Sequence, residues 1–215
     1  MAKKESSFVN MVLTLFVVTA IAALTLGGVY TVTKEPIAIA KLLKIEKAIS
    51  EVLPEFDNIS EYKILPEGGS DSLTFFKATK NGEEVGTAIK TYTDRGFSGR
   101  VWIMVGLNPE GVINNTAVLE HKETPGLGDK MDKTKSDWSN QFNGKNPTEF
   151  KLKVTKNGGD VDAITAATIS SRAFCDAVQR AYDEFKKQES RIKSQEPRVK
   201  NQESRVKNQE ARTKK

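Results

Sequence analysis

The sequence predicts an α+β fold, in which an antiparallel sheet with packed helices is preceded by one N-terminal transmembrane helix. Three observations support this prediction. The 26 residues from Phe8 to Thr33 carry no charge, and a helix of that length reaches roughly 39 Å, enough to cross a hydrocarbon layer of ~30 Å. Short β-prone segments then follow one another with turns of a few residues, which is typical of antiparallel strands. Near the end of the domain, apolar residues recur at helical spacing.

The apolar segment at residues 8–33 is interpreted as a membrane anchor. A cleaved signal peptide is the alternative, because two A-x-A sequences follow or overlap the segment, but the apolar run exceeds the 7 to 15 residues usual for such a signal. Basic residues do not fix the orientation, because they flank the segment on both sides, at Lys3, Lys4, Lys34, Lys41, Lys44 and Lys47. No second apolar run of spanning length occurs in residues 34–215, so we expect everything after the anchor to lie on one side of the membrane.

The domain at residues 34–187 is predicted to begin with a helix from Pro36 to Leu53, because apolar residues recur at helical spacing between two prolines. Asn81-Gly82 is a hairpin signal between two β-prone segments. Helices are predicted over Asp129–Phe142 and Ser171–Lys187. The predicted strands are Ser72–Thr79, Glu84–Tyr92, Arg100–Leu107, Val112–Glu120 and Phe150–Thr155.

The two ends of the chain are short or repetitive. Residues 1–7 form a short N-terminal flank. Residues 188–215 repeat a basic seven-residue unit with one apolar residue per unit, whereas a coiled coil needs two, and Pro197 is expected to interrupt any continuous helix. We therefore expect a solvated, mostly disordered tail, with a partner-binding arm as the alternative.

Composition excludes several classes of protein. The net charge of +5 comes from residues 187–215, which hold 10 basic and 4 acidic residues, so the remainder is nearly neutral and gives no reason to expect nucleic-acid binding. The single cysteine, Cys175, excludes an intrachain disulfide and any cysteine-based zinc or iron–sulfur site. We expect Cys175, Trp102 and Trp138 to pack in the core, and we predict no metal ligands.

Hydroxyl groups gather just before the last predicted helix, in Asp162-Ala-Ile-Thr165-Ala-Ala-Thr168-Ile-Ser-Ser171. A helix start has unpaired N–H groups and a partial positive charge, so these side chains can either cap the helix or help to hold a phosphate. The residues alone leave both interpretations open.

The same segment, Asp-x-x-Thr-Ala-Ala-Thr-x-Ser, closely resembles the flavinylation motif D-x-x-(S/T)-G-A-T-x-(S/T) of the FMN-binding domain family. The resemblance implies that Thr168 bears FMN through a phosphoester, with Asp162 and Thr165 as the leading acid and first hydroxyl of the motif. It also implies a separate flavin transferase that uses FAD and magnesium. Ala166 stands where the family usually has glycine; if that position needs a positive φ, alanine is costly there.

A second segment, His121-Lys-Glu-Thr-Pro-Gly-Leu-Gly-Asp129, looks like the H-x-E-T-P-G-L-G signature of the same family. By resemblance, Glu123, Thr124 and Leu127 line the isoalloxazine ring, and Gly96-Phe97-Ser98-Gly99 helps to form the pocket wall. An ordinary loop is the alternative for each segment. Lys156 is a weaker candidate that could offer positive charge to the cofactor.

The resemblance implies a function. The chain is similar to G subunits of Rnf-type complexes, which couple electron flow between ferredoxin and NAD to ion transport, and the implied partners are the other membrane subunits. No general acid or base is expected, because a flavin ring itself stores electrons. The implied location is the bacterial inner membrane, with the domain on the periplasmic side. Alternatives are the C subunit of sodium-pumping NADH:quinone reductase, a freestanding flavinylated carrier, and a membrane-tethered binding module without flavin. A Ser-His-Asp hydrolase around His121 lacks its G-x-S-x-G motif.

Overall fold

The computed structural model describes residues 7–213, with the side chains of residue 193 and residues 195–213 outside the description. The chain divides into two units, residues 1–46 and residues 47–215. Of the flank predicted at residues 1–7, only residue 7 is among the described residues.

The first unit contains most of α1 (Phe8–Val52), which is a single helix with Pro36 inside it. The prediction that a separate helix begins at Pro36 is therefore wrong. A proline in a helix interior removes one backbone hydrogen bond and costs about 3 kcal/mol, but helix-forming residues on both sides carry α1 through this position. Among the described residues, α1 is the one helix long and apolar enough to cross a membrane, by length and composition.

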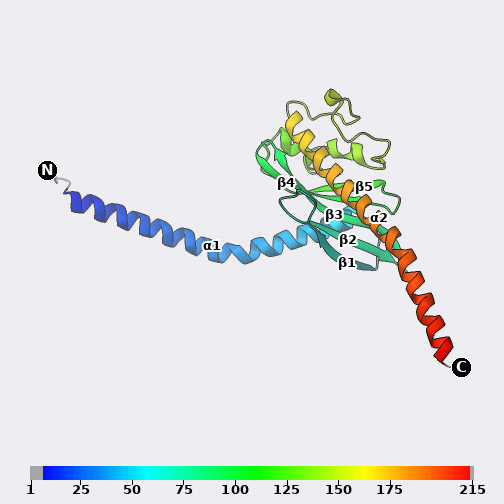
Figure 1. The fold of residues 1–215 in the computed structure, drawn as a ribbon. Coiled ribbons are helices and arrows are strands. Elements are labelled where there is room, and N and C mark those ends of the chain that lie inside the picture. The colour runs from blue at the N-terminus through cyan, green and yellow to red at the C-terminus, as the bar shows by residue number, and fades with distance from the viewer. Residues whose placement is uncertain (1–6, 214–215) are drawn as a thin grey trace. The chain divides into compact units, whose positions relative to one another are not determined.

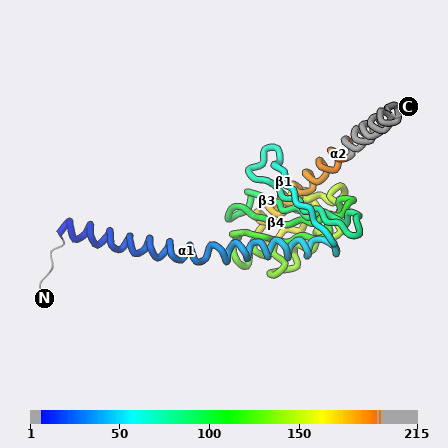
Figure 2. Tube along the Cα trace, turned by 90° about the horizontal axis from the view of Figure 1, so that it is seen from below, coloured from blue at the N-terminus to red at the C-terminus, as the bar shows by residue number. Residues whose placement is uncertain are grey.

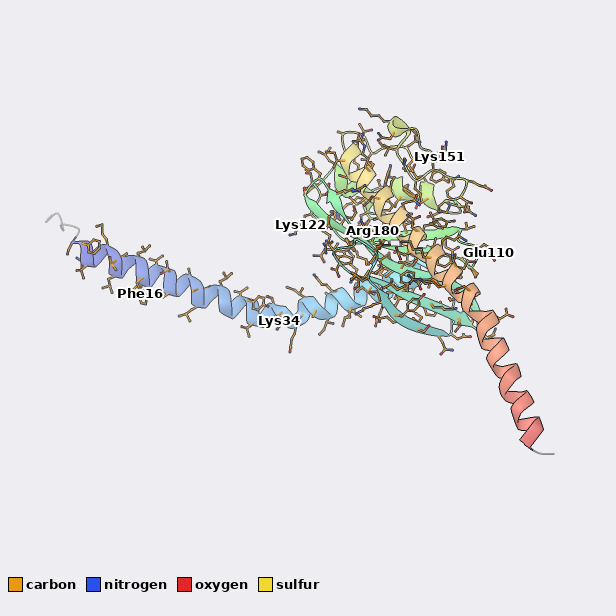
Figure 3. The ribbon with its side chains drawn as sticks, in the orientation of Figure 1. Phe16, Lys34, Glu110, Lys122, Lys151 and Arg180 are labelled. Carbon is orange, nitrogen blue, oxygen red and sulfur yellow. The ribbon has the colours of Figure 1, made fainter. Side chains whose placement is uncertain are left out.

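The side chains of α1 in this unit suit a lipid environment. They project outward around the helix, as Phe16, which is 68% exposed, illustrates in Figure 3. Threonine hydroxyls donate to backbone carbonyls four residues earlier, as Thr33 does to Val29 at 2.8 Å. Such bonds leave no hydroxyl unsatisfied in hydrocarbon, where an unpaired polar group is costly. The other threonines that do this are Thr14, Thr19, Thr25 and Thr31.

The second unit is built on a five-stranded antiparallel sheet in the order β1-β2-β3-β4-β5 (Figure 1). The predicted α+β class is therefore confirmed. Turned by 90° in Figure 2, β1, β3 and β4 again lie next to one another. The strands are β1 (Asn58–Ile64), β2 (Leu73–Lys80), β3 (Glu83–Gly96), β4 (Gly99–Leu107) and β5 (Ile113–Glu120).

The hairpin between β2 and β3 turns at the predicted dipeptide. Asn81 and Gly82 have φ angles of 54° and 84°, which is the left-handed backbone that a two-residue hairpin requires and that asparagine and glycine tolerate best. This turn pairs Thr79 with Glu84, and an irregularity between Ala78 and Thr79 then shifts the register by one residue, so that Phe75 lies opposite Ile89.

The main core lies between one face of the sheet and α2 (Thr168–Thr213). Side chains alternate between the two faces of a strand, and the register puts Phe75, Ile89 and Val105 in one row across three strands. The hydroxyl of Thr91, in β3, donates to the backbone oxygen of Ala177 in α2 at 3.2 Å. Farther along, the guanidinium of Arg180, labelled in Figure 3, lies over the Tyr92 ring at 4.7 Å. These contacts fix the first half of α2 on the sheet.

The opposite face of the sheet receives residues 47–53. A side chain on Gly106 would place its Cβ 2.0 Å from the backbone oxygen of Val52, so only glycine permits this approach. The amide of Asn115 donates to the backbone oxygen of Glu51 at 2.9 Å. The last turn of α1 is thereby part of the folded domain, as a buried cap on β4 and β5.

Two predicted elements differ from the structure. Asp129–Phe142 holds two 3₁₀ helices, η1 (Gly128–Met131) and η2 (Trp138–Phe142), instead of one α-helix. The hydroxyl of Ser136 donates to the oxygen of Lys130 and accepts from the amide of Trp138. Local side-chain bonds of this kind compete with helical bonds.

The predicted strand Phe150–Thr155 is also wrong. Its backbone bonds are used in a local turn with residues 159–161, where Val161 and Asp160 donate to the oxygens of Lys153 and Lys151. One isolated bridge, between Val154 and Val161, is all the β-structure there.

The last predicted helix starts three residues earlier than expected, at Thr168, and α2 reaches Thr213. Its bounds include most of the basic repeats of residues 188–215 and also Pro197, so the expectation that Pro197 interrupts any continuous helix is wrong. The side chains of the last three repeats lie outside the described residues, so the expectation of a solvated, disordered tail stays a prediction.

Candidate functional site

A cavity of about 300 Å³ lies at the start of α2. Three segments far apart in sequence form its walls: the turn after β3, the loop after β5, and the residues that lead into α2. Ligand cavities in proteins usually measure about 300 to 1,000 Å³, so the cavity is at the small end of that range. The lining residues are Phe97, Glu123, Thr124, Leu127, Gly128, Ala166, Ala167, Thr168, Ile169 and Ser170.

The chain enters α2 through a strained turn. Ala166 has a φ of 61°, a left-handed conformation that costs an L-residue with a side chain roughly 1–2 kcal/mol. The next amide, that of Ala167, donates to the oxygen of Ile164 at 3.0 Å and closes the turn. This strained turn lies two residues before Thr168, the predicted FMN acceptor, and sets the direction in which α2 begins.

The hydroxyl of Ser171 connects the first turn of α2 to the segment that precedes the helix. The hydroxyl of Ser171 accepts from the amide of Ile164 at 2.9 Å and donates to the oxygen of Ala167 at 3.0 Å. In the part of the chain whose side chains are described, neither the Thr165 nor the Thr168 hydroxyl makes a hydrogen bond. Thr168 is half-buried and lines the cavity, and its hydroxyl is not used in a hydrogen bond to another described residue.

A buried carboxylate joins the three walls. Glu123 is 5% exposed. It accepts hydrogen bonds from the hydroxyl of Ser170 at 2.5 Å and from the backbone amide of Ser98 at 3.0 Å. Its own amide donates to Nδ1 of His121 at 3.1 Å. The cavity is thus held in shape by hydrogen bonds between its walls.

The mouth of the cavity is apolar. Phe97, Ile169 and Leu127 are 67%, 47% and 40% exposed, although a large apolar side chain in water forgoes the free energy of burial. They come from the three different walls. Apolar side chains from three walls suit a ligand with a flat, partly apolar ring.

The structure brings some of the sequence-predicted residues together and leaves others apart. Glu123, Thr124, Leu127 and Thr168 all line the cavity. Asp162, Thr165 and Lys156 do not line it and are exposed. Lys156 lies in η3 (Thr155–Asn157), away from the cavity wall.

Asp162 is held through its backbone. Its oxygen accepts from the indole N–H of Trp138 at 2.6 Å and from the side chain of Gln141 at 3.3 Å, and its amide donates to Gln141 at 2.8 Å. These bonds fix the segment that leads into the strained turn at Ala166. The structural contribution of Asp162 is therefore at its main chain.

Some lining residues were not predicted as site residues, namely Gly128, Ala167, Ile169 and Ser170. Each lies inside one of the two motifs, so motif membership was the available signal. The contact between Ser170 and Glu123 joins residues 47 apart in sequence, and no local pattern indicates it.

A second, larger cavity of about 550 Å³ lies further along α2. Its lining includes Arg95, Arg172 and Asp176, with Cys175 at the α2 wall. Burial raises the pKa of the Cys175 thiol to about 12, so this thiol is protonated and packs as expected. None of the residues that line the first cavity lines the second.

Comparison with known proteins agrees with this geometry. Residues 96–183 match the FMN-binding domain family, and that range contains every residue that lines the Thr168 cavity. The chain is 35% identical over 161 residues to the G subunit of the ion-translocating oxidoreductase complex of Shewanella piezotolerans, covering 70% of this chain and 76% of the relative. It is 34% identical over 194 residues to the protein of the same name from Aliivibrio fischeri, covering 85% of this chain and 91% of the relative.

The likeness to the Aliivibrio protein extends over nearly the whole length of both chains, beyond the matched domain. We conclude that the chain belongs to the family of G subunits of Rnf-type ion-translocating oxidoreductase complexes.

Proposed function

We propose that this protein is a membrane-anchored electron-transfer subunit that carries FMN bound covalently, by a phosphoester, to Thr168. The observation that carries the proposal is the unbonded hydroxyl of Thr168 in the wall of the cavity. This cavity lies within the segment that matches FMN-binding domains.

The residues present fit such a cofactor. Phe97, Leu127 and Ile169 offer apolar contact for the ring. The free amides at the start of α2 and the partial positive charge of a helix N-terminus favour a phosphate next to Thr168. When bound, FMN supplies one- and two-electron chemistry, while the protein supplies orientation and electrostatics.

The attachment is a phosphoryl transfer from FAD. The oxygen of the Thr168 hydroxyl forms a bond to the FMN-side phosphorus of FAD. The bond between that phosphorus and the bridging oxygen of the diphosphate breaks, AMP leaves with the bridging oxygen, and the hydroxyl proton is released. A flavin transferase with magnesium is the proposed catalyst, and this chain supplies the nucleophilic oxygen in an exposed, preformed turn.

The proposed assembly is an Rnf-type complex that couples electron flow between ferredoxin and NAD to ion transport. The names of the relatives support a place in an ion-translocating oxidoreductase complex with other membrane subunits. The apolar helix α1 supports a single-pass location in the bacterial inner membrane. A covalent tether retains the cofactor where no cytoplasmic FMN can replace it, which favours the periplasmic side for the domain.

The test is a pair of threonine variants of the full chain, each produced together with a flavin transferase and separated on a denaturing gel. Thr168→Val should abolish in-gel flavin fluorescence, because it removes the acceptor oxygen and keeps the side-chain shape. Thr165→Val is the matched control and should retain most of the fluorescence, because Thr165 does not line the cavity. Full fluorescence in Thr168→Val would exclude Thr168 as the acceptor.

The main alternative of a different class is a membrane-tethered binding module without flavin. It predicts no fluorescence from the wild-type chain in the same experiment. That alternative explains Thr165 and Thr168 as helix caps. Among the described side chains, neither threonine hydroxyl accepts a hydrogen bond from a backbone amide of α2, which counts against it.

A further inference from the structure

The buried carboxylate of Glu123 occupies a position that a ligand-lining role does not explain. Its two oxygens bond to different walls of the cavity, Oε2 to the hydroxyl of Ser170 in α2 and Oε1 to the amide of Ser98 in the turn after β3. Ser170 comes two residues after Thr168, on the first turn of the same helix. A single side chain thus connects the acceptor helix to a loop more than 70 residues away in sequence.

Two glycines make room for this carboxylate from opposite sides. A Cβ on Gly96 would lie 2.2 Å from the backbone oxygen of Gly99 and 2.7 Å from Oε1 of Glu123. A Cβ on Gly128 would lie 2.5 Å from the hydroxyl oxygen of Ser170 and 2.7 Å from Oε2 of Glu123. Neither glycine has a positive φ, so lack of space is what requires glycine at both positions, and the carboxylate is one of the groups that fill that space.

Glu123 is buried without an ion pair. Among the side chains of residues 7–192 and 194, no Lys or Arg forms a salt bridge with Glu123. Burying a charge is unfavourable unless hydrogen bonds compensate, and bonds to an ionised acceptor are about twice as strong as neutral ones. The hydrogen bonds of Glu123 with Ser170 and with Ser98 hold its side chain in place and connect two walls of the cavity.

We propose that Glu123 is a positioning residue that holds the first turn of α2 and the 96–99 loop in the geometry that Thr168 needs to accept FMN. This inference rests on the proposed function. Glu123 acts through Ser170 and Ser98, so its effect on flavin attachment depends on hydrogen bonds and not on its charge.

Replacing Glu123 by a neutral side chain separates an effect of its hydrogen bonds from an effect of its charge. In Glu123→Gln, the amide oxygen can accept from the Ser98 amide while the NH₂ group donates to the Ser170 hydroxyl, so both contacts survive without the charge. Glu123→Ala removes both contacts, and Ser170→Ala removes one. Thr91→Val is the matched control, because it removes a buried bond between β3 and α2 that lies outside the cavity.

The experiment measures the rate at which the full-length chain acquires flavin from a purified transferase with FAD and magnesium. Glu123→Ala and Ser170→Ala should be roughly ten- to a hundredfold slower than wild type, since small misplacements of a reacting group have effects of that size. Glu123→Gln should recover most of the rate that Glu123→Ala loses, and Thr91→Val, which lies outside the cavity, should stay within about twofold of wild type. Equal rates in wild type and Ser170→Ala, or a Glu123→Gln rate as low as that of Glu123→Ala, would overturn the proposal.

A second readout needs no flavin. Amide hydrogen exchange of the unmodified full-length chain should be faster in the peptide containing Ser98 for Glu123→Ala, and unchanged for Glu123→Gln and Thr91→Val. If the exchange of the peptide containing Ser98 were the same in Glu123→Ala as in wild type, Glu123 would not be what holds the 96–99 loop, and the proposal would be contradicted. A wild-type chain that never acquires flavin would instead refute the proposed function, whatever the exchange pattern shows.

Discussion

Replacement of Ala166 by glycine should stabilise the protein and speed flavin attachment. Ala166 has a φ of 61°, and left-handed backbone costs roughly 1–2 kcal/mol for an L-residue with a side chain. Glycine removes that strain but gives the unfolded chain more freedom, which costs about 0.4–1 kcal/mol. The difference is a net gain of roughly 0.5–1 kcal/mol. Little burial is lost, because Ala166 is exposed. For a domain of this size the gain raises Tm by about 1–4 °C.

The assay is thermal unfolding of the full-length chain in detergent, followed by tryptophan fluorescence, together with the rate of flavin attachment. Asn81→Gly is the matched control, because Asn81 also has a positive φ, of 54°, but lies in the β2–β3 hairpin. That variant should change Tm slightly and leave flavin attachment unchanged. A lower Tm in Ala166→Gly, or an attachment rate no faster than that of wild type, would refute the argument that strain at this turn limits the acceptor.

Three further predictions concern the domain that carries the cavity. Gly106→Ala should destabilise the domain by about 3 kcal/mol, at the upper end of overpacking costs, because its Cβ would meet the backbone of Val52; an unchanged Tm would show that this contact is not tight. Trp138→Phe removes the hydrogen bond from the indole N–H to the backbone oxygen of Asp162. It should lower the free energy of unfolding in denaturant by about 1 kcal/mol and slow flavin attachment. If neither quantity changed, this prediction would be contradicted. Because burial raises the pKa of the Cys175 thiol to about 12, the thiolate is scarce at pH 8 and increases only as pH rises. An alkylating reagent should therefore label the native chain far more slowly than the urea-unfolded chain, and equal rates would show that the thiol is exposed.

The strands that carried clear alternation and turn signals were predictable. The β2–β3 hairpin follows from Asn81-Gly82, and four of the five strands overlap their predicted ranges. β1 was missed because Asn58–Ile64 is mostly exposed and polar, with no buried face to impose a pattern. Phe150–Thr155 has strand-like composition, but its backbone bonds are used by residues 159–161, which the local sequence does not reveal.

The candidate site was predictable where it depends on contiguous motifs and not where it depends on tertiary contacts. The motifs indicated Thr168, Glu123, Thr124 and Leu127, which the fold brings to one cavity. The glycine preference at position 166 also agrees with the positive φ found there. The bond from Ser170 to Glu123 spans 47 residues, so only the folded chain reveals it.

The most direct test of the central claim is the intact mass of the full-length chain, produced together with a flavin transferase and measured after denaturation, with peptide mapping of any modification. The account predicts a mass increase of one FMN phosphoester, located on the peptide that contains Thr168. An unmodified chain from cells in which the same transferase modifies another target, or flavin on a different peptide, would contradict it.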